Sequence, residues 1–452
     1  VVSRSMDGIF IINSSSYPYN MSCYLQIISG TLFPNVRKMN YSESVKLPKD
    51  HHFIVNEDTF IITCKSETNH DNVTKIIFKR AYMGVKLKED KRSIIEVSEK
   101  NAKKDNEANK FDVNSMSISI IVFDSTSRSQ FARHMKKSKA LMDKMGFVTL
   151  LGYNKVGDNS APNLGPILAS PYKESEDYDI LDGLGDINLA KILPYRKQIN
   201  PDDIPFLWKK MQKKGCEVLF NDDIMHTSRG LFHYTAKYFK PGFSHKPTEH
   251  YYRPYYNYLY QFLQNKWKLC LDNQLLSEEF MNPWYLALKH LADRCYFSFS
   301  FLTSPSHDNP NTLESVDEGL STRLKDLRDK GDLSNTLMII MGDHGQRMHH
   351  SKATFAGRIE ERQPLMSIRL PEQFIIQYPN EYANLITNAH RLTSNVDIHE
   401  TLKDIIENRL GKNREKGRGQ SLFTSISSTR TCKDAFIPIN FCLCQFNATT
   451  ED

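Results

Sequence analysis

The chain has 452 residues, which is enough for a large catalytic domain together with an accessory region. Hydrophobic residues make up 40% and charged residues 25%, the composition of an ordinary globular protein. The net charge of +6 arises from 59 basic and 53 acidic side chains spread along the chain, so we expect no nucleic-acid partner. No stretch approaches the roughly 18 to 20 apolar residues that span a bilayer, so a membrane contact would need a segment outside this chain.

The chain divides into four parts by composition. Short runs of β-branched and aromatic residues predict a small β-rich accessory region over 1–85. Lys, Asp, Glu and Asn crowd 86–110, which is typical of a solvated linker. We expect the catalytic domain over 111–430 and a Cys-rich tail over 431–452.

Within the catalytic part, apolar runs of strand length alternate with helical patterns. This alternation predicts an α/β domain with a parallel or mixed sheet covered by helices on both faces. The strands are expected at 117–123, 147–151, 217–220, 296–302 and 337–341, and the helices at 249–271, 277–291, 313–330 and 398–410.

Two features indicate an oxidising compartment, either the lumen of the secretory pathway or the extracellular space. Asn-x-Ser/Thr sequons cluster towards the two ends of the chain and predict N-glycosylation. They lie at Asn13, Asn20, Asn40, Asn72 and Asn447. The eight cysteines fit disulfides, although their pairing is left open, and a zinc site at Cys432, Cys442 and Cys444 is the alternative. The chain starts at Val1 without a signal peptide, so we expect the secreted or membrane-anchored part of a longer precursor.

Polar residues follow directly after the apolar runs. In open α/β sheets the ligand crevice lies outside the carboxyl ends of the strands, so these residues are candidates to line one site. They are Asp124, Asp222, His307 and Asp343. Asp343 and the adjacent His344 suit one divalent cation, with Asp124 as a further ligand and with Gly345 permitting a sharp turn. Taken alone, Asp124 is better explained as the cap of the next turn and Asp343 as the partner of an arginine, and only the two together favour a metal site.

Ser160 is the candidate nucleophile. It precedes Pro162, which suits a first helical turn, so Ser160 is expected at or just before a helix N-terminus. Free N–H groups and the helix dipole favour an anion there, and a metal beside the hydroxyl would activate it without a histidine base. The alternative is that Ser160 only caps the helix.

Four segments together resemble the alkaline phosphatase superfamily and, within it, a sulfatase-like family of extracellular proteins of unknown function. The resemblance covers roughly residues 111 to 440. Its segments are 123–128 (FDSTSR), 152–160 (GYNKVGDNS), 341–345 (MGDHG) and 357–362 (GRIEER).

The resemblance implies roles for these residues. Asp124, Asp343 and His344 would hold a divalent metal, Ser160 would contact it and attack phosphorus or sulfur, and His307 would donate a proton to the departing alkoxide. Residues that could reach a second metal or the substrate are Asp308, Asn309, His349 and His350. Ser125 stands where many sulfatases have another Asp, so zinc or manganese is favoured over calcium or magnesium.

A second departure from the family pattern favours phosphate over sulfate chemistry. Sulfatases convert a Cys or Ser to formylglycine in a Cys/Ser-x-Pro-x-Arg segment, and this chain has Leu164 in place of the arginine. We therefore expect an unmodified Ser160 and a phosphate ester or diester substrate, whether a small molecule, a glycan or a lipid head group. The alternatives are a sulfatase, or a non-catalytic extracellular binding protein on the same fold.

Overall fold

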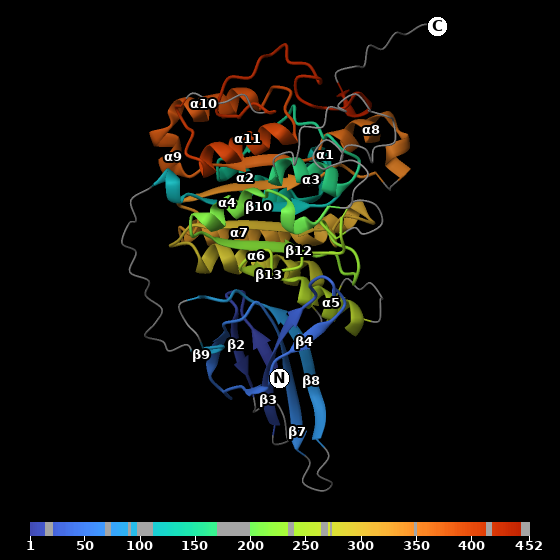
Figure 1. Ribbon diagram of the computed structural model, residues 1–452, viewed down its shortest axis with the longest axis vertical. Helices are drawn as coiled ribbons and strands as arrows, with labels where there is room; N and C mark the ends of the chain where they lie inside the picture. The colour runs from blue at the N-terminus through green and yellow to red at the C-terminus, as the bar shows by residue number, and fades with distance from the viewer. Residues whose placement is uncertain are drawn as a thin grey trace.

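The computed structural model describes residues 1–13, 21–67, 74–88, 92–96, 112–169, 199–233, 239–263, 270–271, 274–347, 350–412 and 418–443. An α/β body carries the carboxyl-terminal three quarters of the chain, and the strands of the N-terminal residues lie at one end of it (Figure 1). Among the described residues, no helix combines the length and the apolar character needed to cross a membrane.

The body is built on a seven-stranded sheet with the order β11-β18-β17-β10-β16-β12-β13. Strands β17, β10, β16, β12 and β13 are mutually parallel, whereas β18 is antiparallel to both of its neighbours, so the predicted mixed sheet is confirmed. The bounds of its strands are β10 (Ser117–Phe123), β11 (Val148–Thr149), β12 (Glu217–Asp222), β13 (His250–Tyr251), β16 (Tyr296–Leu302), β17 (Thr336–Gly342) and β18 (Met366–Arg369).

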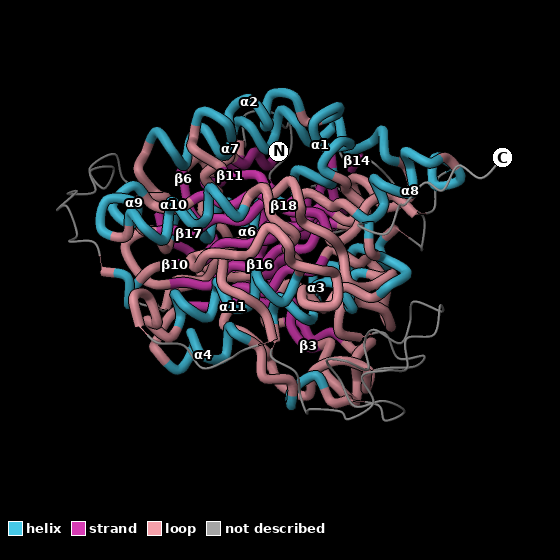
Figure 2. Tube along the Cα trace, turned by 90° about the horizontal axis from the view of Figure 1, so that it is seen from above, coloured by secondary structure: helices cyan, strands magenta, loops and turns pink. Residues whose placement is uncertain are grey.

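Helices cover both faces of this sheet (Figure 2). Because successive strand residues point to opposite faces, Ile120 of β10 packs into one apolar core and Ile121 into the other. The first core includes side chains from α3 (Ser160–Leu168), α4 (Leu207–Lys213), α9 (Glu372–Gln377), α10 (Pro379–Asn388) and α11 (Asn395–Ile406). The second includes side chains from α1 (Arg128–His134), α2 (Lys136–Lys144), α5 (Arg253–Phe262), α6 (Leu276–His290) and α7 (Asp317–Asp329).

Two helix predictions were too long. Residues 249–271, predicted as one helix, contain β13, then α5, and finally β14 (Cys270–Leu271), which pairs with β15 (Gln274–Leu275). Helix α5 begins at Arg253 because Pro254 suits a first turn but not a helix interior. In 313–330, a 3-10 helix, η5 (Pro310–Val316), precedes α7.

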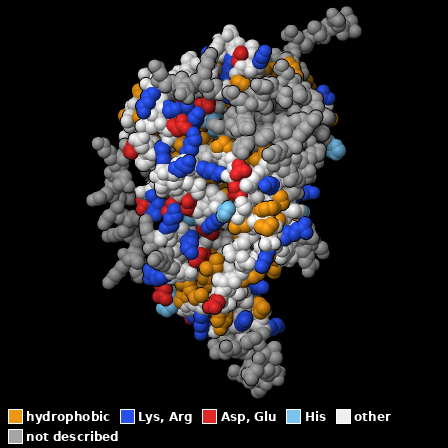
Figure 3. Space-filling model, viewed as in Figure 1, with side chains coloured by type: hydrophobic (Ala, Val, Ile, Leu, Met, Phe, Trp, Pro, Cys, Tyr) orange, Lys and Arg blue, Asp and Glu red, His pale blue; other side chains and the backbone are white. Residues whose placement is uncertain are grey.

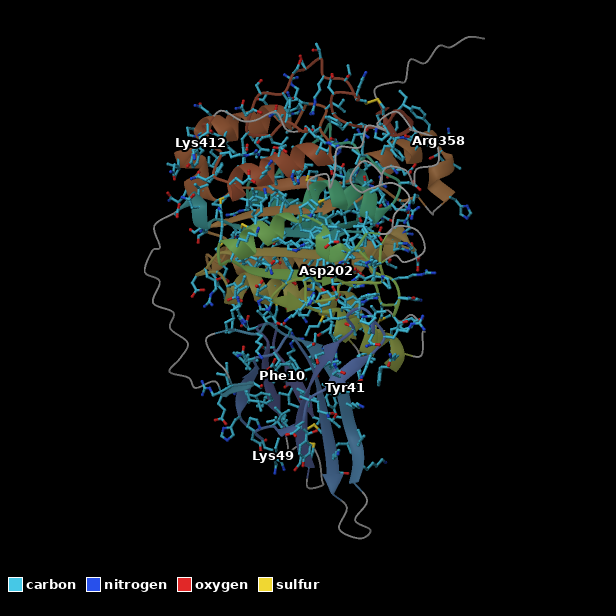
Figure 4. All side chains as sticks on the ribbon, viewed as in Figure 1. Phe10, Tyr41, Lys49, Asp202, Arg358 and Lys412 are labelled. Atoms are coloured by element: carbon cyan, nitrogen blue, oxygen red, sulfur yellow. A yellow bond between two sulfur atoms is a disulfide. The ribbon has the colours of Figure 1, made fainter. Side chains whose placement is uncertain are left out.

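The N-terminal residues form two antiparallel sheets that share a small apolar core. Phe10, Phe53, Phe60 and Tyr82 fill this core, and Figure 4 marks the position of Phe10. One sheet contains β1 (Val2–Arg4), β2 (Ile9–Ile12), β6 (His52–Val55) and β9 (Ile94–Glu96), and the other β3 (Met21–Gly30), β4 (Met39–Tyr41), β5 (Val45–Lys46), β7 (Thr59–Glu67) and β8 (Thr74–Met83). Strand β9 falls inside the segment expected to be a linker, and the division of the chain into four parts stays a proposal.

A buried ion cluster joins the N-terminal sheets to the body. Nδ1 of His250, on the edge strand β13, lies 2.8 Å from Asp58 Oδ1, and its Nε2 lies 3.1 Å from Glu217 Oε2. Although burial opposes both shifts, the contact between the two residues lowers the pKa of Asp58 to about 2 and raises the pKa of His250 to about 9. His250 is therefore protonated at neutral pH, and its charge is shared by the two carboxylates.

Three disulfides connect six of the eight cysteines, which fits an oxidising compartment. Cys23 pairs with Cys64 between β3 and β7, and Cys216 with Cys295 just before the parallel neighbours β12 and β16. The third disulfide joins Cys432 to Cys442, so the alternative zinc site at these residues is wrong. Cys270 is an exposed free thiol, and Cys444 lies outside the described residues.

Candidate active site

Asp124 and Asp343 lie at the carboxyl ends of the adjacent parallel strands β10 and β17, as the strand-end argument predicts. They come together with His344, and ligand atoms of the three side chains all lie within 4.8 Å of one another. All three are at most 3% exposed. Within the described part of the chain, this is the one group of His, Cys, Asp or Glu side chains with a metal-binding arrangement.

Two glycines let the backbone close around this group. A Cβ atom on Gly342 would lie 2.0 Å from the carbonyl oxygen of Thr126, and one on Gly345 would lie 2.1 Å from that of Glu360. Gly345 is therefore required for the close approach of α8 (Phe355–Arg362), and not for the sharp turn that the sequence suggested. Its N–H donates to the carbonyl of Glu361 at 2.9 Å.

Ser125 orients both carboxylates. Its backbone N–H donates to Asp343 Oδ1 at 2.9 Å, and its hydroxyl donates to Asp124 Oδ1 at 2.8 Å. Ser125 adopts the left-handed conformation, with φ at 55°, which aims both donors at the site. The residue that replaces an expected ligand thus acts as the hydrogen-bonding partner of two others.

The group has an excess of negative charge. Burial, followed by the carboxylate of Asp343, raises the pKa of Asp124 well above its usual value. Burial lowers the pKa of His344, against the opposing charge of Asp343. The His344 Nδ1 lies 2.8 Å from the Gly345 carbonyl, so Nδ1 carries the hydrogen, and the lone pair of Nε2 is left for a ligand.

The unsatisfied atoms of the group fit a divalent cation. His344 Nε2 lies 3.4 Å from Asp343 Oδ2 and 3.8 Å from Asp124 Oδ1. Both His344 Nε2 and Asp343 Oδ2 are buried and receive no hydrogen bond from the described residues. Buried acceptors without donors are rare in folded proteins, and two carboxylates with one neutral imidazole match the ligands that zinc and similar cations prefer.

Ser160 is the first residue of α3 and is half-buried, with Asn159 as the N-cap, so the alternative of a capping Ser160 is wrong. The loop before it is held by Asn163, whose Oδ1 accepts from the N–H groups of Val156 at 3.0 Å and Gly157 at 2.9 Å. The hydroxyl of Ser160 therefore lies at a helix N-terminus, and the loop before it is held by hydrogen bonds to Asn163.

Asp158 connects this loop to the metal-binding group. Its Oδ2 lies 3.4 Å from NH1 of Arg347, three residues after His344, and its Oδ1 lies 3.8 Å from Nζ of Lys155. Lys155 is wholly buried and pairs with Glu361 at 2.7 Å. Burial lowers the pKa of Lys155, against the charge of Glu361. The sequence reasoning missed Lys155 and Arg347, although Lys155 lies inside the segment GYNKVGDNS that carried the resemblance.

His307 follows β16, the other neighbour of β10, and is 46% exposed. Its Nδ1 lies 2.6 Å from Asp308 Oδ1, and its carbonyl accepts from Gln346 Nε2 at 3.3 Å. Asn309 caps η5 by accepting from Asn311 N–H at 3.0 Å. His350 is exposed at the start of η6 (His350–Ala353), and His349 lies outside the described residues.

Asp222 and Asp223 brace loops. Asp222 accepts from the N–H groups of Ile224 at 3.0 Å and Leu231 at 2.6 Å. Asp223 accepts from the N–H groups of Thr303 at 2.6 Å and Ser304 at 3.0 Å. Burial raises the pKa of Asp223 to about 6 in spite of these hydrogen bonds. Asp223 thereby ties the end of β12 to the segment that leads to His307.

Of the five sequons, Asn13 and Asn40 lie among the described residues, and both are exposed. Asn20, Asn72 and Asn447 lie outside the described residues. N-glycosylation stays a prediction.

The fold and the site define an α/β protein with a mixed sheet and a candidate metal-binding group at the carboxyl ends of its central strands. The chain belongs to the family described as "Protein of unknown function (DUF229)", which matches residues 6–452. This match confirms the resemblance to a family of unknown function. Comparison with curated protein sequences gives no match.

Similar solved structures include enzymes of phosphorus chemistry. A protein in the alkaline phosphatase superfamily from Vibrio parahaemolyticus has a TM-score of 0.42 and 12% identity over 71% of this chain and 72% of that chain. A phosphonate monoester hydrolase from Silicibacter pomeroyi has a TM-score of 0.40 and 15% identity, over 70% of this chain and 78% of that chain. The soluble domain of a lipooligosaccharide phosphoethanolamine transferase from Neisseria meningitidis has a TM-score of 0.39 and 12% identity, over 65% of this chain and 88% of that chain.

Proposed function

We propose that this chain is a metal-dependent hydrolase or transferase of phosphate esters, with Ser160 as the nucleophile. The observation that carries the proposal is the bridge from Asp158 to Arg347, which connects the loop before Ser160 to the loop that bears Asp343 and His344. A candidate nucleophile at a helix N-terminus is thus tied to a buried group that needs a cation. The three disulfides favour action in the lumen of the secretory pathway or outside the cell.

Each residue of the site has a separate role in the proposed reaction. A divalent cation held by Asp124, Asp343 and His344 would lower the pKa of the Ser160 hydroxyl and neutralise charge on the substrate. Ser160 Oγ forms a bond to phosphorus while the bond from phosphorus to the alkoxide leaving group breaks. The N–H groups at the start of α3 stabilise the charge on the non-bridging oxygens. Water, or an acceptor alcohol, then releases the phosphoryl group from the serine.

His307 is the proposed proton donor to the departing alkoxide. The contact of its Nδ1 with Asp308 leaves Nε2 to face the substrate. Its carbonyl is held by Gln346, which follows Asp343 and His344 by two to three residues. These contacts support a position of His307 at the same edge of the sheet as Ser160.

Phosphate chemistry is favoured over sulfate chemistry by the environment of Leu164. This residue stands where formylglycine-dependent sulfatases have an arginine, and its side chain is wholly buried in the apolar core beneath α3. An arginine at this position would lose its hydration in the apolar core without contacting Ser160 or the substrate. We therefore propose that Ser160 remains a plain serine, which a mass measurement of its peptide would check.

The test is turnover of phosphate monoesters and diesters by the purified protein and its Ser160→Ala variant. We expect kcat to fall by about 10³-fold or more with metal still bound, because the variant loses the nucleophile but keeps Asp124, Asp343 and His344. Ser315→Ala, which removes an exposed hydroxyl from η5, is the matched control and should behave like the parent. A phosphoserine trapped at residue 160 would complete the assignment. Full activity of Ser160→Ala would refute it, and a metal-loaded parent inert on all esters would favour a binding protein.

A further inference from the structure

A second cluster of functional side chains lies at the same edge of the sheet as the candidate active site. The loop 224–233 follows β12, and the sheet order places β12 two strands from β10. Strands are spaced by about 4.8 Å, so this loop begins roughly 10 Å from Asp124 along the sheet, with His307 above the strand between them. A ligand that reaches both places must be larger than a single phosphate ester.

One face of α5 positions this loop. Arg253 donates through NH1 to the carbonyl of Ile224 at 2.7 Å and through NH2 to the carbonyls of His226 and Arg229. Tyr260, seven residues along the helix and therefore on the same face, packs its ring against the imidazole of His226 with 5.1 Å between centroids. Helix α5 therefore holds three backbone carbonyls of the loop and the imidazole of His226.

The same helix face holds a loop of the N-terminal residues beside it. Asn257, one turn after Arg253, donates through Nδ2 to the carbonyl of Val36 at 3.0 Å. The backbone N–H of Phe33 donates to the carbonyl of Phe243 at 2.8 Å. Arg37 is therefore carried by the N-terminal sheets to the same side of α5 as His226 and Arg229.

The resulting cluster is basic and has an aromatic member. Arg37 and Arg229 are exposed, and no carboxylate of the described residues lies within ion-pair distance of either guanidinium. His226 Nδ1 accepts from the N–H of Ser228 at 3.1 Å, so Nε2 of the neutral ring carries the hydrogen and can donate. Burial, followed by the charges of Arg229, Arg253 and Arg37, lowers the pKa of His226 and keeps the ring neutral. Figure 3 shows Lys and Arg side chains beside hydrophobic ones over the region of α5.

We propose that Arg37, His226, Arg229 and Tyr260 form a binding subsite for an anionic oligosaccharide whose ester group occupies the site at Ser160. Guanidinium groups bind sulfate, phosphate or carboxylate substituents in two-pronged fashion. A neutral imidazole donates to ring or hydroxyl oxygens, and a partly exposed tyrosine ring packs against the apolar face of a sugar. The inference rests on the proposed function only for the link to Ser160.

Other anionic partners fit the cluster less well. A membrane surface binds broad patches of flexible lysines, whereas this cluster has two arginines beside a pair of packed rings. An acidic peptide would satisfy the arginines but would leave the aromatic ring without a sugar face. Both partners are therefore outcomes of the test.

The experiment measures binding without turnover. The full chain carrying Ser160→Ala is titrated with a heparin-derived hexasaccharide, with an unsulfated hexasaccharide, with poly-glutamate of matched charge, and with vesicles that contain phosphatidylserine. Adding Arg37→Ala and Arg229→Ala should weaken hexasaccharide binding by about tenfold or more, because two charge-assisted contacts are lost. Adding Tyr260→Leu should also weaken it, whereas Tyr260→Phe should not.

The matched control removes two exposed lysines from α2 and α7, in the variant Lys137→Ala, Lys325→Ala, and should bind as the Ser160→Ala parent does. Equal weakening in the control, or binding of poly-glutamate or vesicles as tight as that of the hexasaccharide, would overturn the subsite. Absence of hexasaccharide binding would overturn it too. Because no chemistry is required, a failure of the Ser160 assignment leaves this measurement unaffected.

Discussion

Two buried clusters of carboxylates and histidine share almost the same composition but differ in charge balance. At the junction with the N-terminal sheets, both ring nitrogens of His250 face carboxylates, those of Asp58 and Glu217. At the candidate active site, His344 directs one nitrogen to a backbone carbonyl and only a lone pair to Asp124 and Asp343. The pKa of Asp58 is accordingly lowered, whereas that of Asp124 is raised.

The difference shows how the backbone decides what a cluster does. A histidine with both nitrogens aimed at carboxylates takes up a proton, and its charge holds together the two parts of the chain that carry Asp58 and Glu217. A histidine whose Nδ1–H is bound to Gly345 cannot supply that charge at Nε2 without a second proton, which burial opposes. That cluster remains short of positive charge until a cation binds.

Loss of the proposed metal ligands should have the largest effect. We expect stoichiometric divalent metal in the parent and an affinity lower by about 10³-fold or more in the double variant Asp343→Asn, His344→Ala, because two of three ligands are lost. Elemental analysis after exhaustive dialysis measures this. The control His51→Ala, at an exposed residue of the N-terminal region, should keep its metal. Metal retained by the double variant would mean that the ion binds elsewhere.

Replacement of His250, where the N-terminal sheets meet the body, should lower stability instead. His250→Ala removes the buried cation that Asp58 and Glu217 share and leaves them only Lys246 and Arg294, so we expect a loss of about 3–5 kcal/mol in the free energy of unfolding, with the metal content unchanged. Urea denaturation measures the loss. A variant as stable as the parent would show that Asp58 and Glu217 find other cations, such as Lys246 near Asp58.

The same cluster should make stability fall at alkaline pH. The pKa of His250 is raised from 6.5 to about 9 on folding, so its contribution is fully present below pH 6.5 and is lost as the pH rises through 9. The shift corresponds to about 2–3 kcal/mol, because one pKa unit is worth about 1.4 kcal/mol and part of the shift is shared with Asp58. Urea titrations at pH 6.5 and 9.5 should show the fall in the parent and its absence in His250→Gln. An equal fall in both would assign it to other groups.

The smallest expected effect is on the stability of the metal-free protein. In chelated protein, Asp343→Asn removes one of two mutually repelling carboxylates, so we expect the metal-free variant to be more stable than the metal-free parent by about 1 kcal/mol. Thermal unfolding in excess chelator measures it. A destabilised variant would mean that the hydrogen bonds from Ser125 and His344 to Asp343 outweigh the repulsion.

Much of the sheet and of the metal-binding group was predictable because both depend on local pattern. Continuous apolar runs predicted the buried strands β10, β16 and β17, and strand-end polarity predicted that Asp124 and Asp343 would meet. Lys155 and Arg347 were missed because an isolated basic residue carries no periodic signal. Only packing shows that Lys155 is buried beside Glu361 and that Arg347 reaches Asp158. The helix predicted over 249–271 failed because its apolar pattern reflects burial in several short elements rather than one.

The sequence by itself determined the α/β class, the family resemblance and the order of the residues Asp124, Ser160, His307, Asp343 and His344. These properties follow from side-chain periodicity and from short motifs, which are local in the chain. The tertiary structure alone decided that His250 faces two carboxylates with both ring nitrogens whereas His344 turns one to a backbone carbonyl, because this depends on how distant segments pack. It also decided that a loop of the N-terminal sheets reaches α5 beside Arg229, since contacts between distant segments leave no trace in a single sequence.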